Sequence, residues 1–268
     1  MVKKYDIKVL VLTEVRISGM VAVRKIKQIG FSDHLKQDAN GFSGGIWVIW
    51  NKNEAELSLL ATHKQFIHVK IKWAVNKMVE LATFVYGSPR RAGRRLLWEE
   101  LNNISLSVNK LWIVLGDFNA VSQHHEKKGG NDACQGSMRE FNDCLASCDL
   151  SDIGFKGSSF TWKRGRLLER LDRVVSNTDW VGSCPQRFIL HLPFLCSDHR
   201  PLLLWEGKRH SQGRANRTFK FLASWLHCDG FDDLVKRCWP DETKWDVGST
   251  TFQHEATLWN DTTFEESM

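Results

Sequence analysis

The stretch LWIVLGDFNAV, residues Leu111–Val121, decides the fold of this chain. Its run of apolar and β-branched residues, bounded by a glycine, is typical of a buried strand. Asp117 and Asn119 follow at the end of that strand, and side chains at positions i and i+2 of an extended chain point to the same face. The stretch therefore predicts a carboxylate and a carboxamide side by side. A local turn is the alternative, because both residue types favour turns.

Apolar stretches on both sides of this segment predict alternating strands and helices. Three runs with short connections predict an antiparallel meander: Leu57–His63, Gln65–Trp73 and Met78–Tyr86. Other strands are expected at Ile7–Thr13, Gly41–Trp50, Ser159–Lys163, Leu168–Ser176, Phe188–Leu192 and Pro201–Trp205. Helical spacing predicts helices over Ser18–Gly30, Arg90–Ser105 and Ser137–Ser147, the last with a capping box of Ser137 and Glu140.

Size and composition indicate a globular α/β protein. The chain has 268 residues, of which 42% are hydrophobic and 25% charged. Its net charge of +6 permits an anionic partner such as nucleic acid without requiring one. No apolar run approaches the roughly 20 residues that span a bilayer, so we expect no membrane partner. The seven cysteines form no CxxC pair, which indicates reduced thiols and an intracellular location, with the nucleus as one option.

The character of the sequence changes after Gly207. Basic residues then follow without hydrophobic periodicity: Lys208, Arg209, Arg214, Arg217 and Lys220. We therefore predict one domain over 1–207, followed over 208–268 by a basic linker and a weakly structured helical tail.

Polar side chains that suit phosphate chemistry stand where strands are expected to end. They are Glu14, Tyr86, Asp117, Asn119, Asp172, Asp198 and His199. Carboxylates suit a hard divalent cation, and a metal, a phenol and an amide can each stabilise the charge of a phosphodiester transition state. A histidine beside a carboxylate can act as a general base on water. Because an aspartate inside a strand is disfavoured, Asp172 needs a reason, and orienting His199 is one.

Each of these residues also has a purely structural interpretation. Glu14 could be a solvated strand end, and Tyr86 a packing aromatic. Asp172 could pair with Arg170 or Arg173, its neighbours in the sequence. Four arginines are expected on a solvated helix face, of which the first two could touch a phosphate backbone: Arg90, Arg91, Arg94 and Arg95.

Five motifs together resemble the endonuclease/exonuclease/phosphatase superfamily, which includes DNase I and the apurinic endonucleases. They are LTEVRISG with Glu14, VYGSPR with Tyr86, GDFN with Asp117 and Asn119, ERLDRV with Asp172, and SDHRPL with Asp198 and His199. The resemblance covers about residues 5–205. The segments ANGFSGGIWVIW, VYGSPRRAGRRLLWEEL and SSFTWKRGRLLERLDRVVSN are still more similar to the endonuclease domain of plant LINE-type (non-LTR) retrotransposon polyproteins.

The resemblance implies a four-layer α/β sandwich, in which two packed mixed β-sheets are flanked by helices. It implies hydrolysis of a DNA phosphodiester with Mg²⁺ or Mn²⁺. Glu14 would be a metal ligand, and Asp198 would contribute either to the metal site or to His199. Tyr86 would contact the scissile phosphate. Asn119 would orient either the phosphate or Asp117. Either Asp117, or His199 paired with Asp172, would activate the water, and this choice stays open. Nucleic-acid contacts are expected from the following residues: Arg90, Arg91, Thr161 and Trp162.

One departure from the family's pattern bears on activity. The first strand of the family normally ends in an Asn that helps to hold the metal, whereas this chain has no Asn before Asn40. We therefore expect the first strand and one metal ligand to be missing. Three hypotheses follow: a DNA-nicking endonuclease, an impaired or inactive retroelement remnant that binds nucleic acid, and, third, a phosphatase of the same fold.

Overall fold

The computed structural model describes residues 2–39, 41, 44–183, 186–206 and 233. The chain divides into two units, Met1–Gly207 and Lys208–Met268. The linker and tail predicted over 208–268 lie outside the described residues, apart from Asp233. None of the described helices is both long and apolar enough to cross a bilayer.

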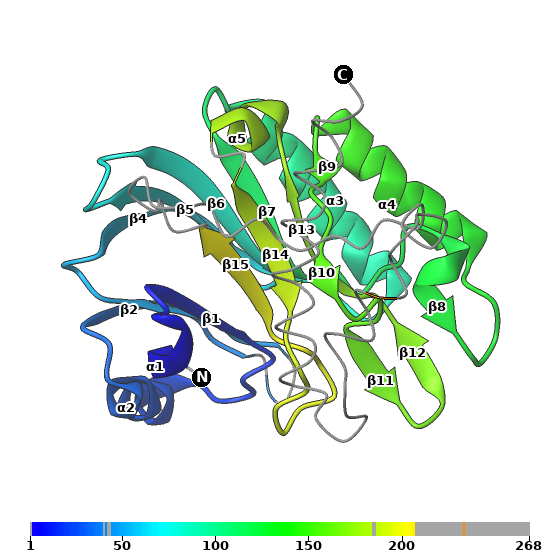
Figure 1. The fold of residues 1–268 in the computed structure, drawn as a ribbon, viewed down its shortest axis with the longest axis horizontal. Helices are drawn as coiled ribbons and strands as arrows, with labels where there is room; N and C mark the ends of the chain where they lie inside the picture. Colours follow the sequence, from blue (N-terminus) through cyan, green and yellow to red (C-terminus); the bar gives the residue numbers. More distant parts are fainter. Residues whose placement is uncertain (1, 40, 42–43, 184–185, 207–232, 234–268) are drawn as a thin grey trace. The chain divides into compact units, whose positions relative to one another are not determined.

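A six-stranded mixed sheet forms the centre of the first unit (Figure 1). Its strands, in spatial order, are β4 (Ala55–His63), β5 (Phe66–Trp73), β6 (Val79–Tyr86), β7 (Trp112–Asp117), β13 (Asp172–Ser176) and β9 (Ser151–Asp152). β4, β5 and β6 pair antiparallel, which confirms the predicted meander. β7 then pairs parallel to β6, after the chain has crossed through helix α3 (Arg91–Ser105).

Two three-stranded sheets lie against the inner face of the central sheet. One has the order β1 (Val9–Thr13), β3 (Ile46–Trp50), β2 (Asp33–Gln37), and the other has the order β10 (Lys156–Gly157), β14 (Arg187–His191), β15 (Leu202–Glu206). Buried side chains from all three sheets form one core cluster, including Val48 of β3, Phe84 of β6 and Ile189 of β14. The prediction of two packed sheets therefore needs one change, because the second β layer consists of two separate sheets.

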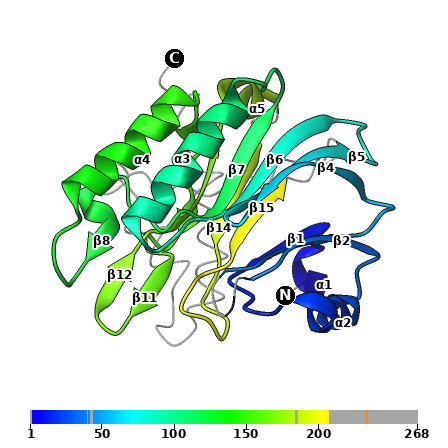
Figure 2. The same cartoon turned by 180° about the vertical axis from the view of Figure 1, so that it is seen from behind.

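Helices cover the outer faces of both β layers. α3 and α4 (Gln135–Ser147) lie on the central sheet (Figure 2). There Leu101 and Phe141 pack with Phe118. α2 (Gly19–Ile29) packs on the outer face of β3, so that all five residues of β3 are buried. The layers are thus helix, sheet, sheet and helix, which confirms the predicted α/β class.

The remaining elements are short. They are α1 (Val2–Tyr5), the 3₁₀ helix η1 (His124–Glu126), α5 (Thr178–Ser183), and a small sheet of β11 (Trp162–Arg164), β12 (Leu167–Glu169) and β8 (Lys127–Lys128).

Two local predictions are wrong. The single strand predicted over Leu168–Ser176 is split into β12 and β13, because the chain leaves the small sheet after Glu169 and joins the central sheet at Asp172. Asp172 therefore begins a strand and does not lie inside one. The predicted capping box is also absent, because α4 begins at Gln135 and Glu140 instead binds Arg91 and Arg95.

A buried ion cluster fixes the position of β13. Arg173, 1% exposed, and Arg170, 7% exposed, each contact the carboxylate of Glu126 at 2.8 Å. Both guanidinium groups also contact Asp152. Burial raises the pKa of Glu126, but the hydrogen bond and charge of Arg173 outweigh burial and hold the pKa at about 2. The cluster therefore occupies the arginines on either side of Asp172.

Glu126→Gln should lower the free energy of unfolding by about 3 kcal/mol at pH 7, because it leaves two buried guanidinium groups short of a counterion. The pKa of Glu126 is lower in the folded protein than its ordinary 4.5, so its contribution is complete above pH 4.5 and is lost as the pH falls towards about 2. Urea unfolding of the two proteins should therefore converge at acid pH. Asp132→Asn, at an exposed position, is the control, and an equal loss in both variants would contradict the account.

Candidate active site

Strand register brings three of the predicted side chains together at one end of the central sheet. Tyr86 of β6 is opposite Asp117 of β7, and Asp117 is opposite Asp172 of β13. Gly116 has φ 138°, and a Cβ at this position would lie 2.1 Å from the carbonyl oxygen of Val85. Only a glycine therefore allows β7 to approach β6 this closely just before Asp117.

A turn, and not an extended strand, joins Asp117 to Asn119. Asn119 has φ 49°, and its backbone N–H donates to Asp117 Oδ1 at 2.7 Å. Its side-chain Nδ2 donates to Asp117 Oδ2 at 2.8 Å and to the carbonyl oxygen of Gly87 at 2.9 Å. The extended i, i+2 geometry predicted from the sequence is wrong. In the turn, however, Asn119 alone donates hydrogen bonds to both carboxylate oxygens of Asp117.

The loop between β14 and β15 supplies the histidine. His199 Nδ1 lies 2.8 Å from Asp172 Oδ2, so its Nε2 is the ring nitrogen left for a substrate. Thr161 Oγ1 accepts the backbone N–H groups of Leu171 and Asp172 at 3.0 and 2.9 Å, which positions Asp172. Trp162 Nε1 donates to Asp198 Oδ2 at 2.9 Å.

Glu14 enters from the opposite β layer, directly after β1. Its carboxylate forms an ion pair with Arg16. Both residues have positive φ, 55° and 51°. Seven described non-glycine residues have positive φ, and four belong to this site: Glu14, Arg16, Asn119 and Cys196. Such strain gathers at functional sites, where the surrounding structure compensates its cost.

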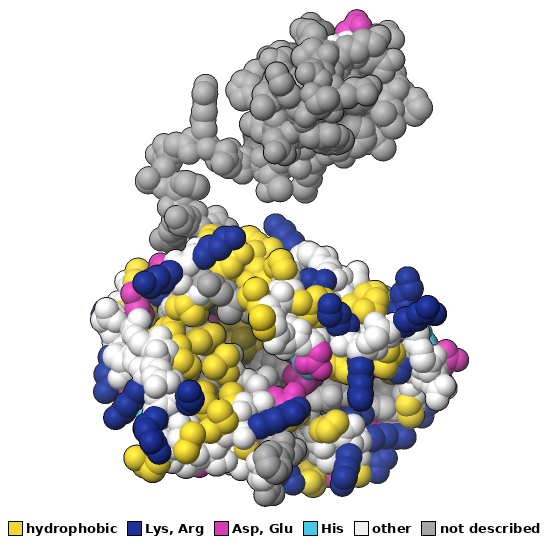
Figure 3. Space-filling model, turned by 90° about the horizontal axis from the view of Figure 1, so that it is seen from below, with side chains coloured by type: hydrophobic (Ala, Val, Ile, Leu, Met, Phe, Trp, Pro, Cys, Tyr) yellow, Lys and Arg dark blue, Asp and Glu magenta, His cyan; other side chains and the backbone are white. Residues whose placement is uncertain are grey.

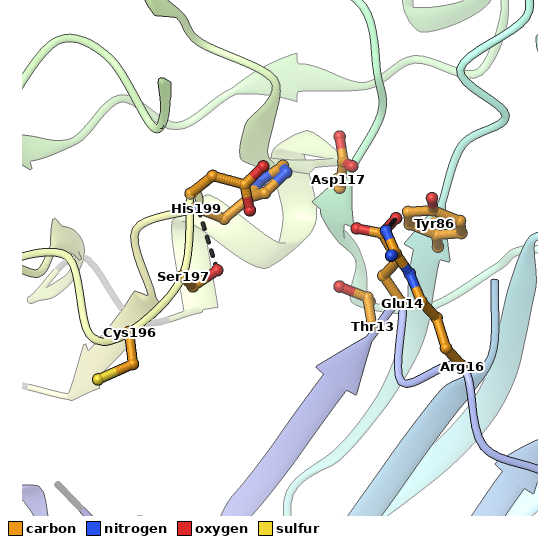
Figure 4. A pocket seen from close by; sticks show the side chains of 9 residues that line it. Thr13, Glu14, Arg16, Tyr86, Asp117, Cys196, Ser197 and His199 are labelled. Carbon is orange, nitrogen blue, oxygen red and sulfur yellow. Dashed lines mark hydrogen bonds and ion pairs between the residues drawn. The ribbon is translucent and has the colours of Figure 1, made fainter. Parts of the chain in front are cut away.

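Several of these side chains line one cavity of about 400 Å³, which we call the carboxylate cavity. Its polar lining includes Glu14, Arg16, Tyr86, Asp117, Asp198 and His199. Figure 4 shows Glu14, Arg16 and Tyr86 on one side and His199 on the other, with Asp117 between them. Seen from below, acidic side chains lie near the centre of this face, beside a hollow bordered by hydrophobic side chains, and Lys and Arg side chains are distributed around the face (Figure 3).

Burial and the neighbouring carboxylates shift several pKa values in the site. Burial and the charge of Asp172 raise the pKa of Asp117 to about 8. Burial lowers the pKa of His199, but the hydrogen bond and charge of Asp172 outweigh it and raise the pKa to about 9. Burial and the charge of Glu14 raise the pKa of Tyr86, so it remains a neutral phenol that can donate a hydrogen bond.

The donor set fits a hard divalent cation. In the described part of the chain, no three His, Cys, Asp or Glu side chains form a ready-made cage. Mg²⁺ does not need one, because it is commonly held by one or two carboxylates together with water and substrate phosphate. Glu14 and Asp198 offer carboxylate oxygens in the same cavity, beside Asp117, whose pKa is raised by burial and by the charge of Asp172. Arg16 is the cation that Glu14 contacts in this structure.

The cavity unites five of the predicted residues, and the others have different positions. Asn119 holds Asp117, and Asp172 holds His199. Thr161 is fully buried, so the prediction that its side chain contacts nucleic acid is wrong. Trp162 is half-buried. Three of the four arginines predicted on a solvated helix face are exposed: Arg90, Arg91 and Arg95. Arg94 is buried, so the prediction is wrong for Arg94 alone.

Arg16 was missed by the sequence analysis. Its signal was available, since it stands two residues after Glu14 at the end of a strand. Nothing in the sequence indicated that Glu14 and Arg16 adopt left-handed backbone conformations, or that the Arg16 guanidinium folds back onto the Glu14 carboxylate.

Comparisons with known proteins agree with this fold and show the family. Residues 3–199 match the sequence model of the Endonuclease/Exonuclease/phosphatase family. An AP endonuclease from Archaeoglobus fulgidus superposes with a TM-score of 0.54 at 15% identity, covering 77% of this chain and 91% of that chain. The endonuclease domain of TRAS1, a telomere-specific non-LTR retrotransposon, gives 0.52 at 15% identity, covering 66% and 80%. No curated protein matches the chain in sequence.

Asp172→Asn should lower the pKa of His199 from about 9 towards or below its ordinary value, because it removes the hydrogen bond and charge that stabilise the imidazolium. The measurement is an NMR titration of the histidine ring protons in metal-free protein, with His199→Ala to assign the signal. A His199 pKa that is the same in both proteins would contradict the pairing.

Proposed function

The chain belongs to the Endonuclease/Exonuclease/phosphatase family, and on this premise we propose that it is a metal-dependent phosphodiesterase that nicks DNA, with water as the nucleophile. The observation that carries the proposal is the convergence of Glu14, Tyr86, Asp117, Asp198 and His199 on one cavity. The enzymes of this family act on phosphoester bonds, typically with divalent metals, and the cavity contains groups suited to each part of that reaction.

In this proposal Glu14 and Asp198 hold Mg²⁺ or Mn²⁺. When bound, the ion would neutralise charge on the phosphoryl oxygens. Asp198 is exposed and is oriented by Trp162, and Glu14 would exchange Arg16 for the metal.

Asp117 accepts the proton of the attacking water. Its two oxygens are held by Asn119, which fixes the carboxylate, and its buried position raises its proton affinity. A base works best when its pKa lies near the working pH. Tyr86, on the adjacent strand, donates a hydrogen bond from its hydroxyl group to a phosphate oxygen.

His199 stabilises the developing negative charge. Asp172 holds Nδ1 and favours the imidazolium, so Nε2 can donate to a phosphoryl or leaving-group oxygen. In this proposal Asp117, and not His199, is the base, because the contact with Asp172 favours the protonated form of His199.

DNA is proposed as the substrate on two grounds. The net charge is +6 and the pI is about 8.9, and the sequence motifs resemble retroelement endonucleases. We further propose that the chain derives from a non-LTR retroelement of the plant LINE type. The likeness of fold to the TRAS1 endonuclease domain is consistent with this origin.

One contact favours a second candidate function, a DNA-binding protein of the same fold with little hydrolytic activity. Arg16 occupies the carboxylate of Glu14, and a metal must displace it. This candidate predicts salt-dependent DNA binding without metal-dependent cleavage. A phosphatase, the third candidate, would release phosphate from a small monoester and leave plasmid intact.

The purified protein should convert supercoiled plasmid to the nicked form with Mg²⁺ and should lose that activity in EDTA. His199→Ala and Asp117→Asn should each lower the rate by at least about 100-fold. The first variant removes the group that stabilises negative charge, and the second removes the base. The measurement is the initial nicking rate on agarose gels.

His125→Ala, at an exposed position outside the cavity, is the matched control and should retain the rate of the parent protein. Nicking that does not depend on metal, or that is equal in His199→Ala and the parent, would exclude the proposed activity. Binding without nicking would leave the second candidate function.

A further inference from the structure

A second cavity, of about 390 Å³, adjoins the carboxylate cavity through one side chain. Asn119 lines this second cavity, and its Nδ2 donates to the Asp117 carboxylate, which lines the first. A ligand long enough to pass Asn119 would therefore meet both cavities.

Basic side chains dominate the charge of the second cavity, which we call the arginine cavity. Arg91 and Arg94 reach it from α3, and Lys127 from β8. Glu169 is the one acidic side chain in the described lining, and it pairs with Lys127 at 2.8 Å. The lining thus has more positive than negative groups.

Arg94 carries a buried charge without a carboxylate partner. It is 7% exposed, and its Nη1 donates to the carbonyl oxygens of Ser88 and Pro89, both at 3.0 Å. Its Nη2 donates to Ser137 Oγ at 2.8 Å. No carboxylate of the described residues lies within ion-pair distance of it. A buried charge is costly without a counterion, so an anion in this cavity would offset that cost.

Arg91 is held in place beside Arg94. Its Nε and Nη2 contact Glu140 at 3.0 and 2.7 Å. A Cβ on residue 136 would lie 2.6 Å from Arg91 Nη2, so Gly136 leaves the space in which the guanidinium lies over the first turn of α4. The guanidinium is therefore fixed before any ligand binds, which lowers the entropic cost of binding.

We propose that the arginine cavity is a phosphate subsite for the nucleic-acid strand whose scissile phosphate lies in the carboxylate cavity. This inference rests on the proposed function. A nucleic acid carries a phosphate at every nucleotide, so a strand that passes Asn119 presents a second phosphate to Arg91, Arg94 and Lys127. None of the described lining residues is aromatic, so the subsite offers no stacking platform and positions the strand without reading its sequence.

Lys127 provides the test, because Arg94 also holds Ser88, Pro89 and Ser137 and its removal would mix binding with folding. In a His199→Ala background that does not cut DNA, binding of a labelled duplex is measured by fluorescence anisotropy across a series of salt concentrations. Lys127→Gln should weaken binding and reduce the slope of log affinity against log salt by about one. Lys128→Gln, the adjacent exposed lysine that does not line the cavity, is the matched control and should retain the slope.

Cys134 supplies a second readout, because its exposed thiol lines the arginine cavity. Its alkylation by N-ethylmaleimide is followed by peptide mass spectrometry, with the duplex or with inorganic phosphate as the probe. Both probes should slow the alkylation of Cys134 in the His199→Ala protein. At the same probe concentrations, protection should be weaker in Lys127→Gln and unchanged in Lys128→Gln.

The possible outcomes separate the subsite from the proposed function. In one outcome the parent protein nicks DNA, Lys127→Gln and Lys128→Gln show the same slope of log affinity against log salt, and neither probe protects Cys134 from alkylation. The proposed subsite is then wrong, and the proposed function stands. If the protein neither nicks nor binds DNA, the proposed function fails, and the assignment of the cavity to a nucleic-acid strand is overturned even if inorganic phosphate protects Cys134.

Discussion

The pairing of β7 with β6 on one side and β13 on the other is the constraint on which the site depends. It aligns Tyr86, Asp117 and Asp172 across three adjacent strands. A shift of one residue in either pairing would turn every side chain of the shifted strand to the opposite face. Gly116 permits the close approach of β7 to β6, and the cluster around Glu126 fixes β13. The geometry of the candidate site is thus a consequence of sheet register.

The arginines beside Asp172 show how the chain keeps this carboxylate available. Arg170 and Arg173 are its sequence neighbours, but both form ion pairs with Glu126 and Asp152 instead. Asp172 therefore pairs with His199. The structural interpretation of Asp172 as an arginine partner is wrong for this reason. The cavity in turn gathers several carboxylates, an arrangement that favours a bound cation.

Much of the fold could be predicted from the sequence, because its signals are local. The three strands β4, β5 and β6 and the buried strand β7 can be predicted from the pattern of apolar and polar residues alone. The split between β12 and β13 could not be predicted, because it depends on Thr161 accepting two backbone N–H groups from distant residues.

The site divides in the same way. The motifs identified Asp117, Asp198 and His199, and the turn at Asn119 was the alternative that its residue type allowed. The contact of Arg16 with Glu14 could not be predicted, because it depends on left-handed backbone that neither residue type favours. The buried position of Arg94 was also hidden, because its partners are backbone carbonyls and a serine of another helix.

The central claim is that the carboxylate cavity holds a divalent metal beside His199. Paramagnetic broadening by Mn²⁺ tests it most directly, with the ring-proton NMR signals of all histidines followed at substoichiometric metal. We predict that His199 broadens before the exposed His124 and His125, and that Glu14→Gln combined with Asp198→Asn abolishes this preference. Uniform broadening of all histidines, or selective broadening that persists in the double variant, would contradict the account.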